Sequence, residues 1–190
     1  MQLIVSADHI EPKAWRNKGG LTRDVLIWPP GSSEDQWQVR ISRADITADG
    51  PFSAYTGVER WFNLLEGRGL TLKVDQQLFT VQAGNAPLVF DGGTAPECHL
   101  LDGPTLVLNF MVRATGQRSM KMANPREPWL ADFACRGLYA YTSGNWSDGQ
   151  QSVHLRAHTL VWQSGSDAPW HFIPDGDAHS GRAWWMGFTP

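Results

Sequence analysis

Residues 15–24, with the sequence WRNKGGLTRD, combine cations, an amide and a hydroxyl with a pair of glycines. Tandem glycines let a backbone approach a bound group closely and adopt positive φ values. Arginine suits carboxylates because its guanidinium donates two parallel hydrogen bonds. The segment therefore has the chemistry of an anion-binding rim, supplied by Asn17, Lys18, Gly19, Gly20, Thr22 and Arg23. A Gly-Gly turn between two strands, with solvated cations, is the structural alternative.

Another cation, Arg60, lies in a strand-like segment on the same face as Val58, Phe62 and Leu64. This follows because side chains two residues apart in a strand point to the same face. An arginine on an apolar face needs a partner or an opening onto a cavity, since unpaired burial of charge is costly. An internal salt bridge and a bound ligand both meet this need, and the two interpretations are equally balanced.

Two more polar residues interrupt strand-like segments. Asn109 lies within residues 106–112, which are otherwise apolar on both faces and predict a strand buried on both sides. A buried amide needs hydrogen-bond partners, and for this strand alone backbone groups are favoured over a ligand. Arg40 shares the polar face of residues 37–42 with Gln38 and Ser42. Such a face is usually exposed, but in a barrel it can line the interior.

Motifs of familiar catalytic centres are missing from the sequence. None of the six histidines forms a His-x-His pair, and there is no Walker loop, nucleophile elbow or dinucleotide fingerprint. Cys98 and His99 are neighbours in a strand-like segment and would point to opposite faces. We therefore predict no catalytic residue, no metal site and no cofactor. The alternative is an enzyme in which Glu59 or Glu66 is a general base and Asp24 orients a cation.

The composition predicts an all-β protein that works in the cytoplasm. The 190 residues include 10 tryptophans, 19 glycines and 12 prolines, which favour aromatic-rich strands and many turns. A net charge of −3 argues against nucleic acid or an anionic membrane as a partner. No window approaches the roughly 20 apolar residues of a membrane span. The start of the chain lacks an export signal, so a disulfide between the two cysteines is not expected.

Two halves of the chain share features. Residues 82–90 match residues 163–172, since both contain Gln-small-Gly followed by Ala-Pro and a phenylalanine, and residues 61–70 have a looser counterpart in residues 138–146. Coincidence between turn residues is the alternative. Residues 113–128 fit a connector, because Pro125 and Pro128 disfavour regular structure. These features predict a bicupin, with two cupin-like β-barrel or jelly-roll units packed together. The N-terminal unit, 1–113, would hold the pocket, and residues 114–190 would form the connector and the C-terminal unit.

The motifs in the first half together resemble those of the HutD/Ves family, which comprises small bacterial proteins of two-domain cupin fold. They occur in the family's order as residues 15–24, 40–42 (RIS), 49–53 (DGPFS), 57–60 (GVER), 64–67 (LLEG) and 109–111 (NFM). The chain departs from the family pattern at Lys18, where a glycine is usual, at Asp24, where glutamate is usual, and at Val107, where an acid is usual.

The resemblance implies a non-catalytic binding protein that regulates or assists histidine utilisation. Its partner would be a small anionic metabolite such as formiminoglutamate, whose two carboxylates suit several converging cations. The pocket would lie in the N-terminal barrel near Asn17, Lys18, Thr22, Arg23, Arg40, Arg60 and Asn109. A metal-independent cupin enzyme acting on a small carboxylate is the alternative. A third interpretation is an interaction module, since open sheet edges allow a homodimer.

Overall fold

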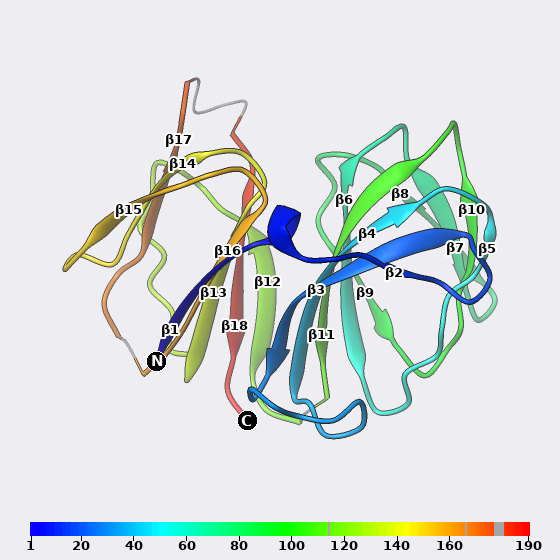
Figure 1. Cartoon of the computed structure of the whole chain (residues 1–190), viewed down its shortest axis with the longest axis horizontal. Helices are drawn as coiled ribbons and strands as arrows, with labels where there is room; N and C mark the ends of the chain where they lie inside the picture. Colours follow the sequence, from blue (N-terminus) through cyan, green and yellow to red (C-terminus); the bar gives the residue numbers. More distant parts are fainter. Residues whose placement is uncertain (114, 166, 177–180) are drawn as a thin grey trace. The chain divides into compact units, whose positions relative to one another are not determined.

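Strands form nearly all of the regular structure, as the abundance of aromatic, glycine and proline residues predicts (Figure 1). The computed structural model describes residues 1–113, 115–165, 167–176 and 181–190. Within these ranges the single helix is the short 3-10 helix η1 (Ala7–His9). No helix in the described part of the chain is long and apolar enough to cross a membrane. The prediction of an all-β fold is confirmed.

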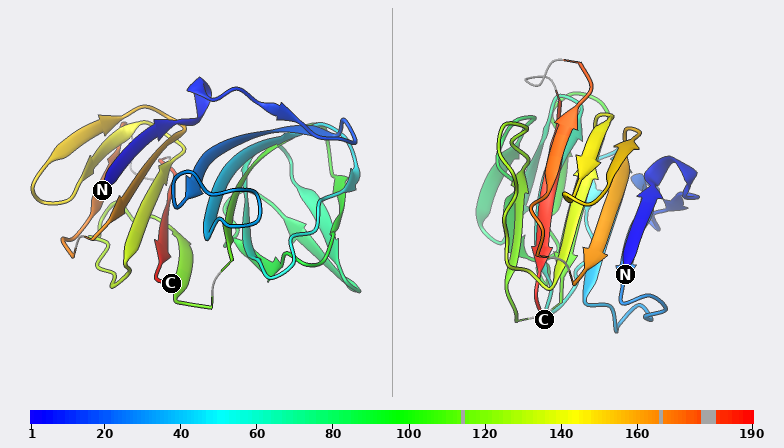
Figure 2. Two further views of the ribbon diagram at one scale, coloured as in Figure 1. Left: turned by 60° about the horizontal axis from the view of Figure 1, so that its bottom comes forward. Right: turned by 90° about the vertical axis from the view of Figure 1, so that its left-hand side faces the viewer.

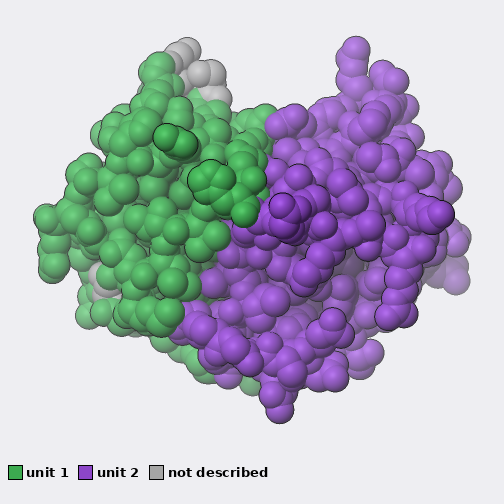
Figure 3. Space-filling model, in the orientation of Figure 1, with its two compact units in different colours: residues 1–9, 115–190 green, residues 10–114 purple. Residues whose placement is uncertain are grey.

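The chain divides into two units, coloured separately in Figure 3. Unit 2 comprises residues 10–114 and contains two sheets. In spatial order, its larger sheet consists of β2 (Lys13–Ala14), β3 (Gly20–Trp28), β4 (Val39–Ile46), β11 (Thr105–Val112), β6 (Glu59–Glu66) and β9 (Leu88–Asp91). Its smaller sheet consists of β5 (Gly50–Pro51), β10 (Glu97–Leu100), β7 (Leu70–Val74) and β8 (Gln77–Val81).

Unit 1 comprises residues 1–9 and 115–190 and also contains two sheets. In spatial order, its larger sheet consists of β1 (Gln2–Ser6), β16 (Thr159–Ser164), β13 (Cys135–Ala140), β18 (Ala183–Phe188) and β12 (Arg118–Met122). Its smaller sheet consists of β15 (Ser152–Leu155), β14 (Gly144–Ser147) and β17 (His171–Pro174).

The two units repeat one strand topology. Apart from β2, β3 and β5, every strand of unit 2 has a counterpart in unit 1 that follows the same chain order and makes the corresponding pairings. The pairs are β4 and β12, β6 and β13, β7 and β14, β8 and β15, β9 and β16, β10 and β17, and β11 and β18. In unit 2, β11 lies between β4 and β6, and β6 pairs with β9. In unit 1, β18 lies between β12 and β13, and β13 pairs with β16.

This topology corrects one of the two sequence matches from which a repeat was predicted. Residues 61–70 lead from β6 to β7 and residues 138–146 lead from β13 to β14, so this looser match joins corresponding strands. Residues 82–90 instead lead from β8 to β9, whereas residues 163–172 lead from β16 to β17. These two turns are not equivalent, and Ser166 lies outside the described residues. The Gln-small-Gly and Ala-Pro match thus reflects the residue preferences of turns rather than the repeat.

The second half of the chain begins at residue 115, next to the predicted boundary, but residues 1–9 are placed differently from the prediction. Residues 1–9 belong to unit 1, because β1 pairs along its length with β16, from Gln2 opposite Gln163 to Ser6 opposite Thr159 (Figure 2). The expected connector contains a strand, β12, which pairs with β18. Backbone hydrogen bonds to distant strands decide both placements, and these pairings leave no local signal in the sequence.

Aromatic and aliphatic side chains fill unit 1. Its core includes four tryptophans whose rings pack together, with ring centroids 5.1 Å apart for Trp129 and Trp185 and 5.0 Å apart for Trp146 and Trp170. Arg136 on β13 is only 1% exposed and lies over the Trp170 ring. The interior of this unit is thus built largely from indole rings, which bury large apolar areas.

Unit 2 has an aliphatic and phenylalanine core. Its members include Ile46, Phe62, Leu64 and Leu72, none of which has measurable exposure. Phe52 and Phe90 are also buried in this cluster. Unlike the tryptophans of unit 1, these side chains leave one part of the barrel interior open.

Candidate functional site

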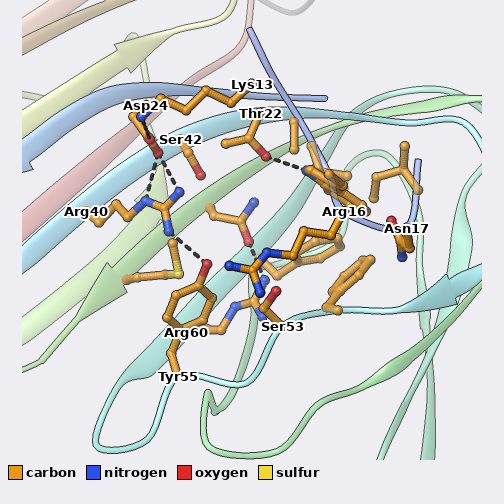
Figure 4. A pocket seen from close by; sticks show the side chains of 18 of the residues that line it. Lys13, Arg16, Asn17, Thr22, Asp24, Arg40, Ser42, Ser53, Tyr55 and Arg60 are labelled. Carbon is orange, nitrogen blue, oxygen red and sulfur yellow. Dashed lines mark hydrogen bonds and ion pairs between the residues drawn. The ribbon is translucent and has the colours of Figure 1, made fainter. Parts of the chain in front are cut away.

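A cavity of about 710 Å³ lies within unit 2 (Figure 4). Its walls come from the inward faces of β3, β4, β6 and β11, from the segment between β5 and β6, and from the β2–β3 hairpin. On β4, alternate residues from Arg40 to Ile46 line it, and on β11 the alternate residues Val107, Asn109 and Met111 do so. The polar face of residues 37–42 therefore contributes to the interior of the barrel through Arg40 and Ser42. The burial pattern of β4 shows that both of its faces are covered.

Arg60 projects from β6 into this cavity and is only 5% exposed. Its guanidinium carbon lies 5.1 Å from the centroid of the Phe90 ring and 5.6 Å from that of Phe52, which are cation–π distances. Its Nη2 donates a hydrogen bond of 2.9 Å to Oδ1 of Asn109. Among the described residues, neither Nε nor Nη1 of Arg60 has a hydrogen-bond acceptor.

No carboxylate among the described residues forms an ion pair with Arg60. Burial, together with the nearby charge of Arg40, lowers the pKa of Arg60 to about 10, although Tyr55 opposes the shift. The side chain is therefore still charged at neutral pH. A buried cation with two unused donors is costly for the fold unless an anion completes it. Arg60 is therefore a candidate anion-binding residue.

Asn109 lies opposite Phe62 in the pairing of β11 with β6, and it is 5% exposed. Its partner is the side chain of Arg60 rather than the backbone group that the sequence favoured. Since Oδ1 accepts from Arg60, the Nδ2 group is left as a donor, and it has no partner among the described residues. Arg60 and Asn109 thus line the cavity side by side with unpaired N–H groups, and such groups suit a carboxylate.

Arg40 lines the same cavity, but its charge is already balanced. Asp24 Oδ1 lies 2.7 Å from both Nε and Nη2 of Arg40, and Nη1 donates to the Tyr55 hydroxyl at 2.9 Å (Figure 4). Burial by itself would lower the pKa of Arg40, but Asp24 and Tyr55 outweigh it and the pKa is raised. Asp24 also pairs with the exposed Lys13 at 3.4 Å. Arg40 therefore acts mainly as a wall of the cavity that orients Tyr55.

The β2–β3 hairpin uses most of its polar atoms to hold its own shape. The indole Nε1 of Trp15 donates to Thr22 Oγ1 at 2.7 Å, and the Gly19 N–H donates to Asn17 Oδ1 at 3.0 Å. Asn17 and Thr22 line the cavity, yet these contacts give both a structural role. A Cβ at Gly20 would overlap the Asp45 carbonyl oxygen and press on the Trp15 ring, so this glycine is needed for close approach.

Four of the predicted residues do not line the cavity: Lys18, Gly19, Gly20 and Arg23. Arg23 instead forms a 2.8 Å ion pair with Asp45 across the β3–β4 pairing. Lys18 is exposed at the tip of the hairpin with φ of 58°, in the left-handed region that favours glycine. Glycine adopts this conformation more readily than lysine.

Other cavity residues were not among the predicted ligand contacts, notably Tyr55, Asp24 and Arg16. Tyr55 lies in a segment without strand periodicity, so no pattern indicated its direction. Asp24 follows Thr22 by two residues on β3, and this shared parity was an available signal. Arg16 lies in residues 15–24, and its neighbours in that segment gave no reason to single it out.

The acids proposed for the alternative enzyme do not meet in this cavity. Glu59 and Glu66 are not among its lining residues, whereas Asp24 is and does orient the cation Arg40. No group of three or more His, Cys, Asp or Glu side chains in the described ranges is arranged to hold a metal ion. Burial raises the pKa of the Cys98 thiol to about 12, so this cysteine is a poor nucleophile at neutral pH.

The strand topology and the cavity define the class of protein: it is a two-barrel, cupin-like protein with a cationic cavity in one barrel. The prediction of a bicupin fold is confirmed by the similarity to cupin-like structures. The HutD family profile matches residues 7–178, and the chain belongs to this family.

Relatives support this assignment. Protein Ves of Citrobacter koseri is 28% identical over 179 residues, covering 93% of this chain and 91% of Ves. A conserved protein of unknown function from Pseudomonas aeruginosa PAO1 superposes with a TM-score of 0.90 at 22% identity, covering 100% of both chains. The structure of HutD from Pseudomonas fluorescens SBW25, in a formate condition, superposes with a TM-score of 0.83 at 19% identity, covering 100% of this chain and 98% of that one.

Proposed function

We propose that this chain binds a small anionic metabolite in the cavity of unit 2, without catalysing its conversion, and so regulates or assists histidine utilisation. The carboxylate of an amino-acid catabolite such as formiminoglutamate would accept hydrogen bonds from Arg60 and Asn109. The observation that carries the proposal is the buried Arg60 guanidinium, which has two unused donors and no carboxylate partner among the described residues.

The comparisons favour the same proposal. Membership of the HutD family is the link to histidine utilisation. The HutD structure from Pseudomonas fluorescens is described for a formate condition, and formate is the smallest carboxylate. The cavity of about 710 Å³ is large enough for a metabolite considerably bigger than formate.

The proposal is tested by titrating the full chain with formiminoglutamate, formylglutamate, urocanate, histidine and glutamate, using calorimetry and thermal unfolding. A ligand at about 100 times its dissociation constant should stabilise the fold by about 2.7 kcal/mol. We expect Arg60→Gln to weaken binding by about 2–5 kcal/mol, the usual effect of truncating a buried charged partner.

Arg23→Gln is the matched control, because Arg23 is paired with Asp45 and lies outside the cavity lining. Its affinity should equal that of the wild type. Since the pKa of Arg60 is about 10, affinity should be constant from neutral pH to about pH 9 and fall as Arg60 loses its proton at higher pH. Binding that survives in Arg60→Gln would contradict the assignment, and no binding of any of these acids would contradict the proposed function.

A further inference from the structure

Arg16 extends from the β2–β3 hairpin over the cavity, toward Arg60 and Ser53 (Figure 4). Its neighbours in sequence do not share this arrangement. Trp15 packs edge-on against Phe52, with ring centroids 5.6 Å apart, and Asn17 holds the turn through the Gly19 N–H. The other polar groups of the hairpin named here stabilise its own conformation, whereas the Arg16 guanidinium is directed toward the cavity.

The charges that line the cavity leave two cations without an acidic partner. Lys13 and Arg40 share Asp24, and Arg60 and Arg16 pair with no acid among the described residues. Arg16 is exposed and makes no hydrogen bond to the described residues. Its guanidinium group is therefore not held in one position at the cavity mouth. Two guanidinium groups directed toward one cavity repel each other, and anionic groups placed between them offset that repulsion.

The two cations differ in how they can hold an anion. Arg60 is fixed by three aromatic rings and by Asn109, so it defines one position deep in the cavity. Arg16 has no such restraint and comes from the opposite wall, at the hairpin. A single carboxylate would pair with the donors of Arg60. The charge of Arg16 would then still be unpaired, and a second acidic group nearer the mouth of the cavity would neutralise it.

From these contacts we propose that Arg16 is a specificity-determining residue that binds a second carboxylate of the ligand. The ligand would lie with one carboxylate on Arg60 and Asn109 and the other on Arg16 beside Ser53. The inference rests on the proposed anion-binding function, and it adds the residue that distinguishes a dicarboxylate from a ligand with one carboxylate.

The test compares the affinity of the full chain for glutarate and for glutaramate, in which a carboxamide replaces one carboxylate. We expect the wild type to prefer glutarate by about tenfold or more, which corresponds to about 1.4 kcal/mol. Arg16→Gln should bring this ratio close to one while leaving the affinity for glutaramate nearly unchanged. Arg60→Gln should weaken the binding of both ligands.

Lys18→Gln is the matched control, because it removes one charge from the same hairpin at a position outside the cavity lining. It should keep the wild-type preference for glutarate. An Arg16→Gln protein that keeps this preference, or loses affinity equally for both ligands, would overturn the role of Arg16 while Arg60-dependent binding upheld the anion site. If neither ligand bound the wild type, the anion site and the role of Arg16 would both be wrong.

Discussion

The two barrels carry a buried arginine on corresponding strands, Arg60 on β6 and Arg136 on β13, but they use its charge differently. Arg136 donates from Nη1 to the Ala168 backbone oxygen at 2.7 Å and lies over the Trp170 ring at 4.9 Å. Arg60 also lies among aromatic rings, yet two of its nitrogens are buried without an acceptor among the described residues. The same strand arrangement thus surrounds a cluster of tryptophan rings in one unit and a cavity with an incompletely paired arginine in the other.

Residue volume explains much of this difference. In unit 1, Trp129, Trp146, Trp170 and Trp185 pack into one cluster that occupies the barrel interior. The corresponding region of unit 2 has smaller aromatic rings and the polar side chains of Arg60 and Asn109. A cupin-like barrel therefore provides a candidate binding site when its interior holds smaller side chains and a buried arginine has unpaired donors.

The largest expected effect comes from opening the filled barrel. Trp170→Ala should lower the free energy of unfolding by about 3–5 kcal/mol, because Trp170 is fully buried between other indoles and its removal leaves a closed void. Phe52→Ala is the comparison in unit 2, and since Phe52 borders an existing cavity, it should cost less, about 1–3 kcal/mol. Urea denaturation followed by circular dichroism measures both. Equal losses would break the distinction between a filled and an open barrel.

A pair of intermediate effects compares the two arginines directly. Arg136→Met should destabilise the ligand-free protein by about 1–3 kcal/mol, because it leaves the buried Ala168 carbonyl without its donor. Arg60→Met should leave stability within about 1 kcal/mol of the wild type or raise it, since an apolar side chain replaces an incompletely paired buried charge. The measurement is again the free energy of unfolding in urea. A larger loss for Arg60→Met than for Arg136→Met would show that Arg60 is structural.

The smallest expected effect concerns the hairpin that carries Arg16. Lys18→Gly should raise the free energy of unfolding by about 0.5–1 kcal/mol, because Lys18 adopts a left-handed conformation that costs a side-chain-bearing residue about 1–2 kcal/mol. Lys18→Ala keeps this backbone cost and serves as the control, with stability close to that of the wild type. Thermal unfolding of the three proteins measures the differences. If glycine and alanine had the same effect, lysine side-chain contacts rather than φ would be responsible.

Much of the fold could be predicted from local patterns, whereas less of the site could. Alternation placed Arg60 and Phe62 on one inward face, and an apolar run interrupted by Asn109 indicated that both faces of β11 are covered. The pairing of β1 with β16 could not be found in this way, because its partners are separated by most of the chain. The Ala-Pro match also misled, since similar turns occur at points of the topology that are not equivalent.

The site shows the same division. The type and parity of Arg60 predicted a buried cation with two possible explanations, a salt bridge or a ligand. Among the described residues the structure gives no salt bridge to Arg60, because Asp24 pairs with Arg40 and Asp45 with Arg23, and no other described carboxylate pairs with it. Ligand binding at Arg60 stays a proposal. Lys18 and Arg23 carry suitable charges in the right segment, but they lie outside the cavity lining.

The sequence by itself determined the strand-rich fold, the inward direction of Arg60 and the family resemblance, because each depends on residue type and short-range periodicity. Only the tertiary structure decided which cations are neutralised and which remain available. Arg40 and Arg60 both line the cavity, but their partners come from other strands and their burial depends on the whole barrel. Charge pairing acts through space, so two arginines with the same chemistry differ in their role. Arg40 is neutralised and forms part of the cavity wall, whereas Arg60 keeps donors that are proposed to bind an anion.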